Sequence, residues 1–387
     1  MNDSTQDVQD SLRRLRVCFV GLGNLPALAP EYARLGSGGA ELQQTLVAKA
    51  LAKRGLEVSM VVADHGQPDQ ASWSGIKTFK AYAPNAGIPV IRFIHPRWTA
   101  LWAALTEADA DIYYVSCAGV LVWQVALFAR IFRRKTVFRV ASDSDCDPRK
   151  LLVALWRDRK LYRYGLRAFD IVLAQTQRQR DLLIRNFDRD SRIVAPMAEP
   201  AGRRLAFHER TIDVLWVANL RPLKRPELLL ALAERLPAMN FHIVGGCYGA
   251  QDYFEEVKHK AAALPNVRLH GAVPYADVAG LVERARLLVN TSETEGFPNT
   301  YLQAWSHGAP VVTFIDPDEV ISREGLGRAV RDFGQMLSAV HELLTNADLW
   351  SAMSRRCAEY VAACHGNTAL DPYVDALLSL RTAADIR

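Results

Sequence analysis

The chain has 387 residues, of which half are hydrophobic and 23% are charged, and its formal net charge is +5. This composition is typical of a globular protein, and no run approaches the ~18–20 uncharged apolar residues that a transmembrane helix needs. Because single hydrophobic cores stop growing near ~250–300 residues, we expect two domains.

The N-terminus and the cysteines indicate a cytoplasmic protein. Residues Met1–Leu12 are polar and acidic and contain no apolar region of the kind found in signal peptides. Six cysteines are scattered without a Cys-x-x-Cys pair, which favours reduced thiols in the core. They are Cys18, Cys117, Cys146, Cys247, Cys357 and Cys364.

Short apolar runs alternate with helical patterns in the first half of the chain. The predicted strands are Arg16–Leu22, Glu57–Ala63, Asp111–Ser116, Thr136–Ala141 and Asp170–Gln175, with Val90–Phe93 as a candidate edge or loop segment. This alternation is typical of a doubly wound α/β domain, in which ligands bind beyond the carboxyl ends of the strands. The rule predicts ligand-facing loops at Leu22–Gly39, Ser116–Gly119 and Ser142–Asp147.

A glycine-rich segment follows the first predicted strand. Gly21 and Gly23 begin a dinucleotide-type fingerprint, but Pro26 occupies its third glycine position, which argues against a Rossmann cofactor site. The loop continues to Gly38 and Gly39, just before a predicted helix at Leu42–Arg54. Glycines at a helix start let backbone amides approach a ligand closely, although a flexible loop is the simpler alternative.

The loop Ser142–Asp147 is the most acidic local cluster of the chain. Spaced carboxylates of this kind can bind a divalent metal. The alternative is that Asp145 or Asp147 caps a helix.

Basic residues gather in a predicted helix at Arg149–Phe169, which also carries Leu151, Leu152, Leu155 and Trp156. A basic amphipathic helix with a tryptophan suits an anionic membrane surface, whereas the same apolar residues can instead pack on the domain's own sheet. We expect no nucleic-acid partner.

The second half of the chain begins after a segment, Pro196–Glu209, that lacks periodicity and is predicted to connect the domains. A clean strand at Thr211–Ala218 leads into a basic loop with Arg221 and Lys224. Arginine and lysine at a strand's carboxyl end suit a pyrophosphate, the former as a bidentate clamp and the latter as a point charge. Surface charges are the alternative.

The stretch Leu287–Pro310 contains a buried strand, a polar turn and a predicted helix that starts near Phe297 or Pro298. Unpaired amides at such a helix start form an anion site, and Glu293 and Glu295 lie just before it. A strand end, an anion site and carboxylates at one crevice indicate a nucleotide-sugar site. An ordinary βαβ unit with solvated acids is the alternative.

This stretch resembles the Glu-x7-Glu signature of family 4 glycosyltransferases, with Glu295 at the first position and Gln303 at the second. The resemblance extends to Gly271-Ala272-Val273 before it and Gly308–Val312 after it. It implies the GT-B fold, in which two Rossmann-like doubly wound α/β domains face a central cleft. In that family the first glutamate faces the donor's sugar and the second holds the ribose hydroxyls, which an amide can also bind.

The resemblance implies catalytic roles for Glu295 and for Asp143, which stands, with Ser142, near the place of a histidine in many members. The implied donor-binding residues are Gly38, Gly39, Asn219, Arg221, Lys224, Gly246, Phe297, Pro298, Asn299, Thr300 and Gln303. It also implies an acceptor-side domain at residues 1–200, a donor domain at 201–365 and a final helix, 366–387, that crosses back to the first domain.

The activity implied is transfer of a hexosyl group from a nucleotide-sugar donor to an acceptor hydroxyl, with retention and without a metal. The acceptor expected is a saccharide or a lipid-linked saccharide of bacterial surface polysaccharide assembly, reached by a protein that is cytoplasmic or peripheral on an anionic membrane. Two alternatives are a synthase or phosphorylase with a soluble acceptor, and a catalytically silent GT-B scaffold.

Overall fold

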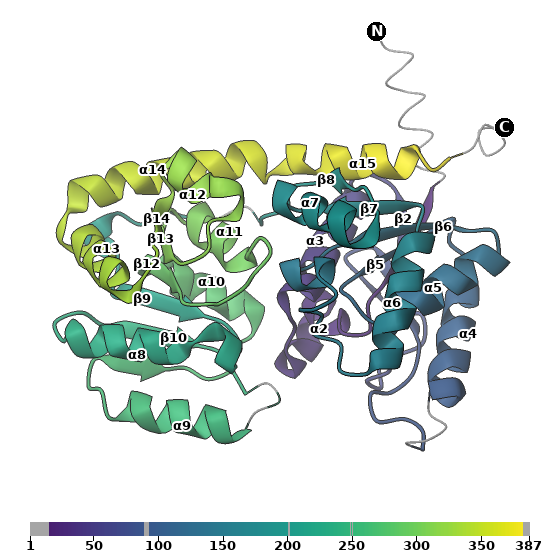
Figure 1. Ribbon diagram of the computed structural model, residues 1–387, viewed down its shortest axis with the longest axis horizontal. Helices are drawn as coiled ribbons and strands as arrows, with labels where there is room; N and C mark the ends of the chain where they lie inside the picture. Colours follow the sequence, from purple (N-terminus) through teal and green to yellow (C-terminus); the bar gives the residue numbers. More distant parts are fainter. Residues whose placement is uncertain (1–14, 89–92, 200–201, 248, 250, 382–387) are drawn as a thin grey trace, which may run out of the picture. The chain divides into compact units, whose positions relative to one another are not determined.

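The computed structural model describes residues 15–88, 93–199, 202–247, 249 and 251–381. The chain divides into two compact units: unit 1 comprises Met1–Met197 and Ala369–Arg387, and unit 2 comprises Ala198–Thr368. Each unit is a mostly parallel sheet with helices against it, which confirms the α/β class (Figure 1). The segments Met1–Leu12 and most of Val90–Phe93 lie outside the described residues.

The described sheet of unit 1 has eight strands in the order β3-β4-β2-β1-β5-β6-β7-β8. All neighbours are parallel except β3 and β4. The strands are β1 (Arg16–Val20), β2 (Glu57–Val62), β3 (Ser72–Trp73), β4 (Ile76–Lys80), β5 (Ile112–Ser116), β6 (Lys135–Arg139), β7 (Ile171–Ala174) and β8 (Arg192–Ile193). The five strands β1, β2, β5, β6 and β7 appear where the apolar runs predict them.

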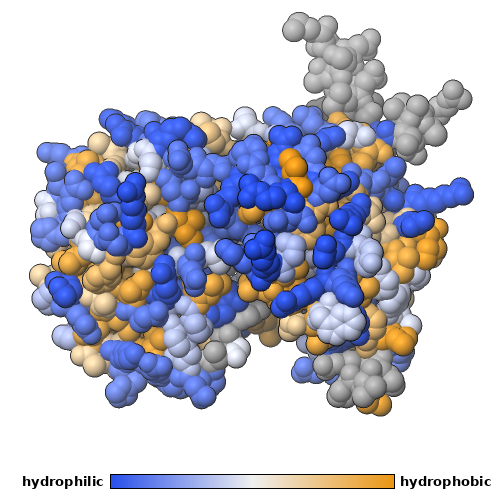
Figure 2. All heavy atoms as spheres, viewed as in Figure 1, coloured by the Kyte–Doolittle hydropathy of each residue, from blue (hydrophilic) through white to orange (hydrophobic). Residues whose placement is uncertain are grey.

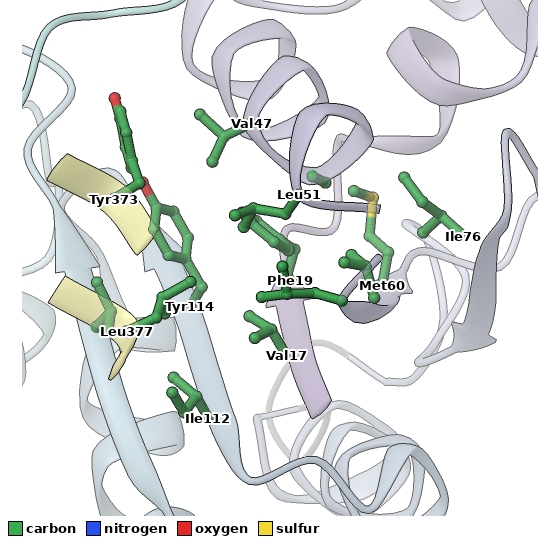
Figure 3. Close-up of a cluster of buried hydrophobic side chains, with 14 of the residues drawn as sticks. Val17, Phe19, Val47, Leu51, Met60, Ile76, Ile112, Tyr114, Tyr373 and Leu377 are labelled. Carbon is green, nitrogen blue, oxygen red and sulfur yellow. The ribbon is translucent and has the colours of Figure 1, made fainter. Parts of the chain in front are cut away.

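The helices of unit 1 bury both faces of this sheet. They are α2 (Leu25–Leu28), α3 (Gly39–Lys53), α4 (Thr99–Ala108), α5 (Val120–Ile131), α6 (Trp156–Ala168), α7 (Gln177–Phe187) and α15 (Asp371–Leu378). On one face, Phe19 of β1 and Tyr114 of β5 meet Leu51 of α3 (Figure 3). Tyr373 and Leu377 of α15 complete that core, so the end of the chain packs within unit 1.

Two predicted helices of unit 1 start elsewhere in the structure. The helix predicted from Arg149 begins only at Trp156, because Leu151 turns into the core (4% exposed) and Leu155 is extended. The helix predicted from Leu42 begins three residues earlier, at Gly39, where Gly38 is the extended N-cap.

The described sheet of unit 2 has six parallel strands in the order β11-β10-β9-β12-β13-β14. They are β9 (Ile212–Val217), β10 (Phe241–Val244), β11 (Val267–Leu269), β12 (Ala285–Asn290), β13 (Val311–Thr313) and β14 (Gly327–Ala329). Because β9 and β12 are neighbours, the loops that follow them meet at the carboxyl edge of the sheet.

The helices of unit 2 are α8 (Pro226–Arg235), α9 (Gln251–Ala262), α10 (Tyr275–Glu283), α11 (Asn299–Ser306), α12 (Val320–Glu324), α13 (Phe333–Thr345) and α14 (Ala347–Cys364). Helix α11 begins one residue later than expected, since Pro298 is its extended N-cap. In the described part of the chain, no helix is long and apolar enough to cross a membrane.

Candidate functional site

The loops after β9 and β12 are held together by hydrogen bonds. The indole Nε1 of Trp216 donates to Thr291 Oγ1 at 2.9 Å, and that hydroxyl donates to the carbonyl of Lys224 at 2.7 Å. The amide of Glu293 donates to the carbonyl of Leu223 at 2.9 Å. These bonds fix the backbone of both loops at the carboxyl edge of the sheet.

Two of the predicted site residues meet in this site. Lys224 Nζ forms an ion pair with a carboxylate oxygen of Glu295, and the two side chains are only 14% and 18% exposed. A cation and a carboxylate that are 71 residues apart in sequence are thus neighbours. Arg221 stands at the start of the same loop in an extended conformation.

Arg225 is a residue of this site that the sequence did not single out. Its backbone is left-handed, with φ 48°. Its Nε donates to the carbonyl of Thr291 at 2.7 Å, and its Nη2 donates to that of Ser292 at 3.2 Å. The guanidinium carbon lies 4.9 Å from the ring centre of Phe314. Arg225 therefore ties the loop after β9 to the loop after β12 and supports the Lys224–Glu295 pair.

The start of α11 completes the carboxyl edge of the sheet. Asn299 and Thr300 are its first helical residues, and their amides lie in the turn that has no intrahelical acceptor. The ring of Phe297 lies 5.3 Å from that of His365 and 6.2 Å from that of Trp305, so this side chain is a packing residue. Gln303 lies one turn further along the same helix and is partly buried.

Two glycines allow the neighbouring loops of unit 2 to approach one another. A Cβ on Gly245 would lie 1.7 Å from the carbonyl oxygen of Ala218, and one on Gly246 would lie 2.9 Å from the Cβ of Ala272. The carbonyl of Gly246 accepts from the amide of Leu220 at 3.0 Å. The turn that contains Asn219 is fixed by this bond.

In unit 1, the glycine-rich segment encloses a carboxylate. Gly38 caps α3, and a Cβ there would lie 2.5 Å from Oε2 of Glu41, while one on Gly23 would lie 3.1 Å from its Cγ. Burial raises the pKa of the Glu41 carboxyl, against the hydrogen bonds that it accepts from backbone amides. Gly38 and Gly39 therefore stand beside the carboxylate of Glu41.

The acidic loop Ser142–Asp147 is occupied by internal contacts. Asp143 accepts from Nε of Arg178 at 2.9 Å and from Nε2 of Gln179 at 3.2 Å. Asp145 accepts from the amides of Ala141 and Ser142 and forms a capping box with Ser142, and burial raises its pKa to about 6. Among the described residues, no group of three or more histidines, cysteines or acids is placed to hold a metal.

Comparison with known protein families identifies the family to which this chain belongs. Residues 38–198 match the family described as "Glycosyl transferase 4-like domain", and residues 211–346 match "Glycosyl transferases group 1". The chain is a family 4 glycosyltransferase. The recognition of the Glu-x7-Glu-like stretch is thereby confirmed.

One curated relative of this glycosyltransferase is the D-inositol 3-phosphate glycosyltransferase of Geodermatophilus obscurus. It is 30% identical over 200 residues, which cover 48% of this chain and 43% of the relative. The match therefore spans less than half of the relative's length.

Solved structures confirm the GT-B fold. A sucrose-phosphate synthase from Thermosynechococcus elongatus aligns with a TM-score of 0.74 at 16% identity, over 95% of this chain and 98% of that one. The Anabaena protein HepE, in complex with UDP and glucose, aligns with a TM-score of 0.68 at 15% identity, over 95% and 100%. At such identities the likeness concerns the fold alone.

Proposed function

We propose that this family 4 glycosyltransferase moves a hexosyl group from a nucleotide-sugar donor to an acceptor hydroxyl, with retention at the anomeric carbon. The observation that carries the proposal is the Lys224–Glu295 pair, held between two cross-linked loops beside the start of α11. The complex of Anabaena HepE with UDP and glucose supports a nucleotide sugar as the donor.

The chemistry follows from where charge develops. The leaving nucleoside diphosphate gains negative charge, which Lys224, Arg221 and the first amides of α11 offset in a largely buried setting. Glu295 orients the hydroxyls of the transferred sugar, and Asp143 has a positioning role in unit 1. Because protein groups already supply the positive charge, we expect transfer to need no divalent metal.

The donor assignment is tested with nucleotides. Among UDP, ADP, GDP and their glucose conjugates, at least one is expected to raise the melting temperature, because a ligand that binds the folded state stabilises it. Lys224→Ala and Arg221→Ala should each weaken that ligand by ~1.5–3 kcal/mol, the worth of a charge-assisted hydrogen bond. Arg235→Ala, at the exposed far end of α8, is the control. Unchanged affinity in the double variant would remove both residues from the site.

Assays of nucleoside diphosphate release distinguish the proposed glycosyl transfer from the two alternative functions. A silent scaffold would bind the donor but release no nucleoside diphosphate with any acceptor. A synthase or phosphorylase would work with a soluble acceptor and gain nothing from lipid. Activity that is lost in EDTA and restored by Mg²⁺ or Mn²⁺ would contradict the metal-free mechanism.

A lipid-linked acceptor is supported by the surface around α6. Leu152, Leu155, Trp156 and Tyr164 are 68%, 55%, 70% and 66% exposed, so they do not pack on the sheet. The same stretch of sequence carries the exposed basic residues Arg149, Lys150, Arg157, Arg159, Lys160 and Arg163. Figure 2 shows hydrophilic and hydrophobic residues side by side on the face of unit 1 where α6 lies.

This combination fits the anionic leaflet of a membrane. Tryptophan and leucine insert at the level of the headgroups, and each basic residue near such a surface contributes roughly 1 kcal/mol. Lys160 Nζ lies 4.9 Å from the ring of Trp156, so charge and apolar surface come together on one helix. We therefore propose that the acceptor is a lipid-linked saccharide, as in surface polysaccharide assembly.

Co-sedimentation with vesicles tests this surface. Binding should rise with the fraction of phosphatidylglycerol, fall with salt, and drop when Arg157, Arg159, Lys160 and Arg163 become Gln. A control variant removes the same charge from unit 2 by changing the exposed residues Arg235, Lys258, Lys260 and Arg331 to Gln. Equal sedimentation with and without phosphatidylglycerol would favour a soluble acceptor.

A further inference from the structure

Arg225 joins three loops at the carboxyl edge of the sheet of unit 2. It lies in the loop after β9, as the residue before α8. Its Nε and Nη2 donate to the carbonyls of Thr291 and Ser292, at 2.7 and 3.2 Å, in the loop after β12. Its guanidinium carbon lies 4.9 Å from the ring centre of Phe314, in the loop after β13. One side chain therefore contacts the loops that follow the next two strands of the sheet.

The backbone of Arg225 is left-handed, with φ 48° and ψ 51°. Glycine adopts this conformation freely, whereas it is strained for a residue with a Cβ. Glycine would fit the backbone better, so what arginine adds at this position is the set of guanidinium contacts. A planar guanidinium donates to two carbonyls at once, whereas the ammonium of a lysine is a point charge without this fork.

The carbonyls that Arg225 holds belong to the segment that carries Glu295. Thr291 and Ser292 are 0% and 2% exposed, and Glu295 follows Ser292 by three residues. Lys224, the residue before Arg225, pairs with the carboxylate of Glu295. Two adjacent side chains of one loop thus hold the two ends of this segment, one through backbone carbonyls and the other through an ion pair.

The two anchors differ in what a bound diphosphate does to them. In the proposed function Lys224 offsets the charge of the leaving diphosphate, so the donor weakens its pair with Glu295. The bonds of Arg225 go to main-chain oxygens, which carry no net charge. Arg225 therefore continues to hold the segment when Lys224 binds the phosphates.

We propose that Arg225 is a positioning residue for sugar transfer, which keeps the carboxylate of Glu295 at the donor sugar while Lys224 neutralises the diphosphate. The proposal rests on the proposed nucleotide-sugar function and adds to it a residue that acts through another. Because Arg225 acts through the placement of Glu295, its effect belongs to kcat and not to the affinity for a nucleoside diphosphate.

Arg225→Gly tests this role, because glycine keeps the left-handed backbone and removes the guanidinium. The probes are whichever of UDP, ADP and GDP binds the wild type, and its glucose conjugate. Calorimetry should give a Kd for the diphosphate within about threefold of the wild type. Release of the diphosphate from the conjugate should slow by about tenfold or more, since a small displacement of a positioned group is costly. Arg225→Lys should lose nearly as much, because it lacks the fork.

Two further comparisons make the result specific. In the Glu295→Gln background, Arg225→Gly should slow release by less than about threefold, because a residue that acts through Glu295 has little left to act on. Arg133→Gly is the matched control, since Arg133 is an exposed arginine of unit 1 that is also left-handed, with φ 53°. This control should leave both the Kd and the release unchanged.

Hydrogen exchange gives a readout that needs no turnover. The amide of Glu293 donates to the carbonyl of Leu223, so its exchange reports whether the two loops stay together. In the diphosphate complex of Arg225→Gly, residues 291–295 should exchange about tenfold faster than in the wild-type complex, while β9 and β12 keep their protection.

The outcomes separate this role from the proposed function. If the wild type binds none of the three diphosphates, the nucleotide-sugar assignment itself fails. If it binds one and Arg225→Gly leaves the exchange of residues 291–295 unchanged, the positioning role is overturned and the assignment stands. Equal slowing of release in the wild-type and Glu295→Gln backgrounds, or full release in Arg225→Lys, would also overturn it.

Discussion

The positive charge of Lys224 is paired with the carboxylate of Glu295, and both side chains have low exposure. A diphosphate must therefore compete with Glu295 for this cation. We expect Glu295→Gln to bind the nucleoside diphosphate several-fold more tightly, since Lys224 is released. Sugar transfer should fall by about a hundredfold, because the group that orients the donor sugar is lost.

Calorimetry and turnover assays measure the two effects separately. Glu293→Gln is the matched control, since Glu293 is exposed and lies in the same loop. Weaker diphosphate binding by Glu295→Gln would contradict the competition, and wild-type turnover would contradict its catalytic role.

A second residue-scale prediction concerns the pair of His242, on β10, and His270, after β11. Nε2 of His270 lies 3.0 Å from Nδ1 of His242, and burial lowers the pKa of His242 to about 4. The unfolded chain takes up this proton near its ordinary pKa of about 6.5. Between these values the unfolded state binds more protons than the folded state, so the free energy of unfolding falls as the pH drops from about 6.5 to about 4.

Denaturant titrations across this range measure the effect. We expect about 1 kcal/mol of the loss to come from His242, after allowance for its partial exposure. His242→Gln should remove that part, whereas His341→Gln, at an exposed position of α13, should not. An identical pH profile for wild type and His242→Gln would contradict the prediction.

Among the elements, α5 and α6 cross at a glycine. A Cβ on Gly165 of α6 would lie 2.7 Å from Cα of Trp123 of α5. We expect Gly165→Ala to lower the free energy of unfolding by about 1–3 kcal/mol, because backbone atoms must move apart. Gly280 of α10 has open space around it, so Gly280→Ala should instead stabilise by about 0.5–1 kcal/mol. Urea denaturation measures the free energy of unfolding of both variants. Equal changes in Gly165→Ala and Gly280→Ala would contradict a close contact between α5 and α6 at Gly165.

The strands were predictable from the sequence because they are buried on both faces. The predicted strand Asp111–Ser116 contains β5, and the predicted strand Thr211–Ala218 contains β9. Helix starts depended on distant contacts instead. Because Leu151 is buried, α6 begins only at Trp156. The periodicity of a segment does not show which of its residues will be buried in the core.

The candidate site was predictable to the same extent. The strand-end rule brought Lys224 and Glu295 to one edge of the sheet, where they pair. The contacts of Arg225 depend on a left-handed backbone, and the surroundings of Glu41 depend on its close approach to Gly23 and Gly38. Neither feature is encoded in the spacing of residues along the chain.

At the scale of the whole molecule, unit 1 is closed by the end of the chain. Helix α15 contributes Tyr373, Val374 and Leu377, and the residue before it, Leu370, joins them in the core that contains Phe19 and Tyr114 (Figure 3). The buried Arg139, which is 1% exposed, interacts electrostatically with Tyr373, whose hydroxyl donates to the carbonyl of Ala195 at 3.0 Å. The fold of unit 1 therefore depends on residues that follow all of unit 2 in the sequence.

Ending the chain after Thr368 should destabilise unit 1 selectively. Each lost apolar side chain removes about 1.5–3 kcal/mol of burial, and Arg139 is left as a buried charge without its phenol partner. Hydrogen exchange should show faster exchange in β1, β5, β6 and α3, while β9 and β12 of unit 2 keep their protection. A chain ended after Arg381 is the control and should match the full chain. Equal loss of protection in both units would contradict the assignment of α15 to the core of unit 1 alone.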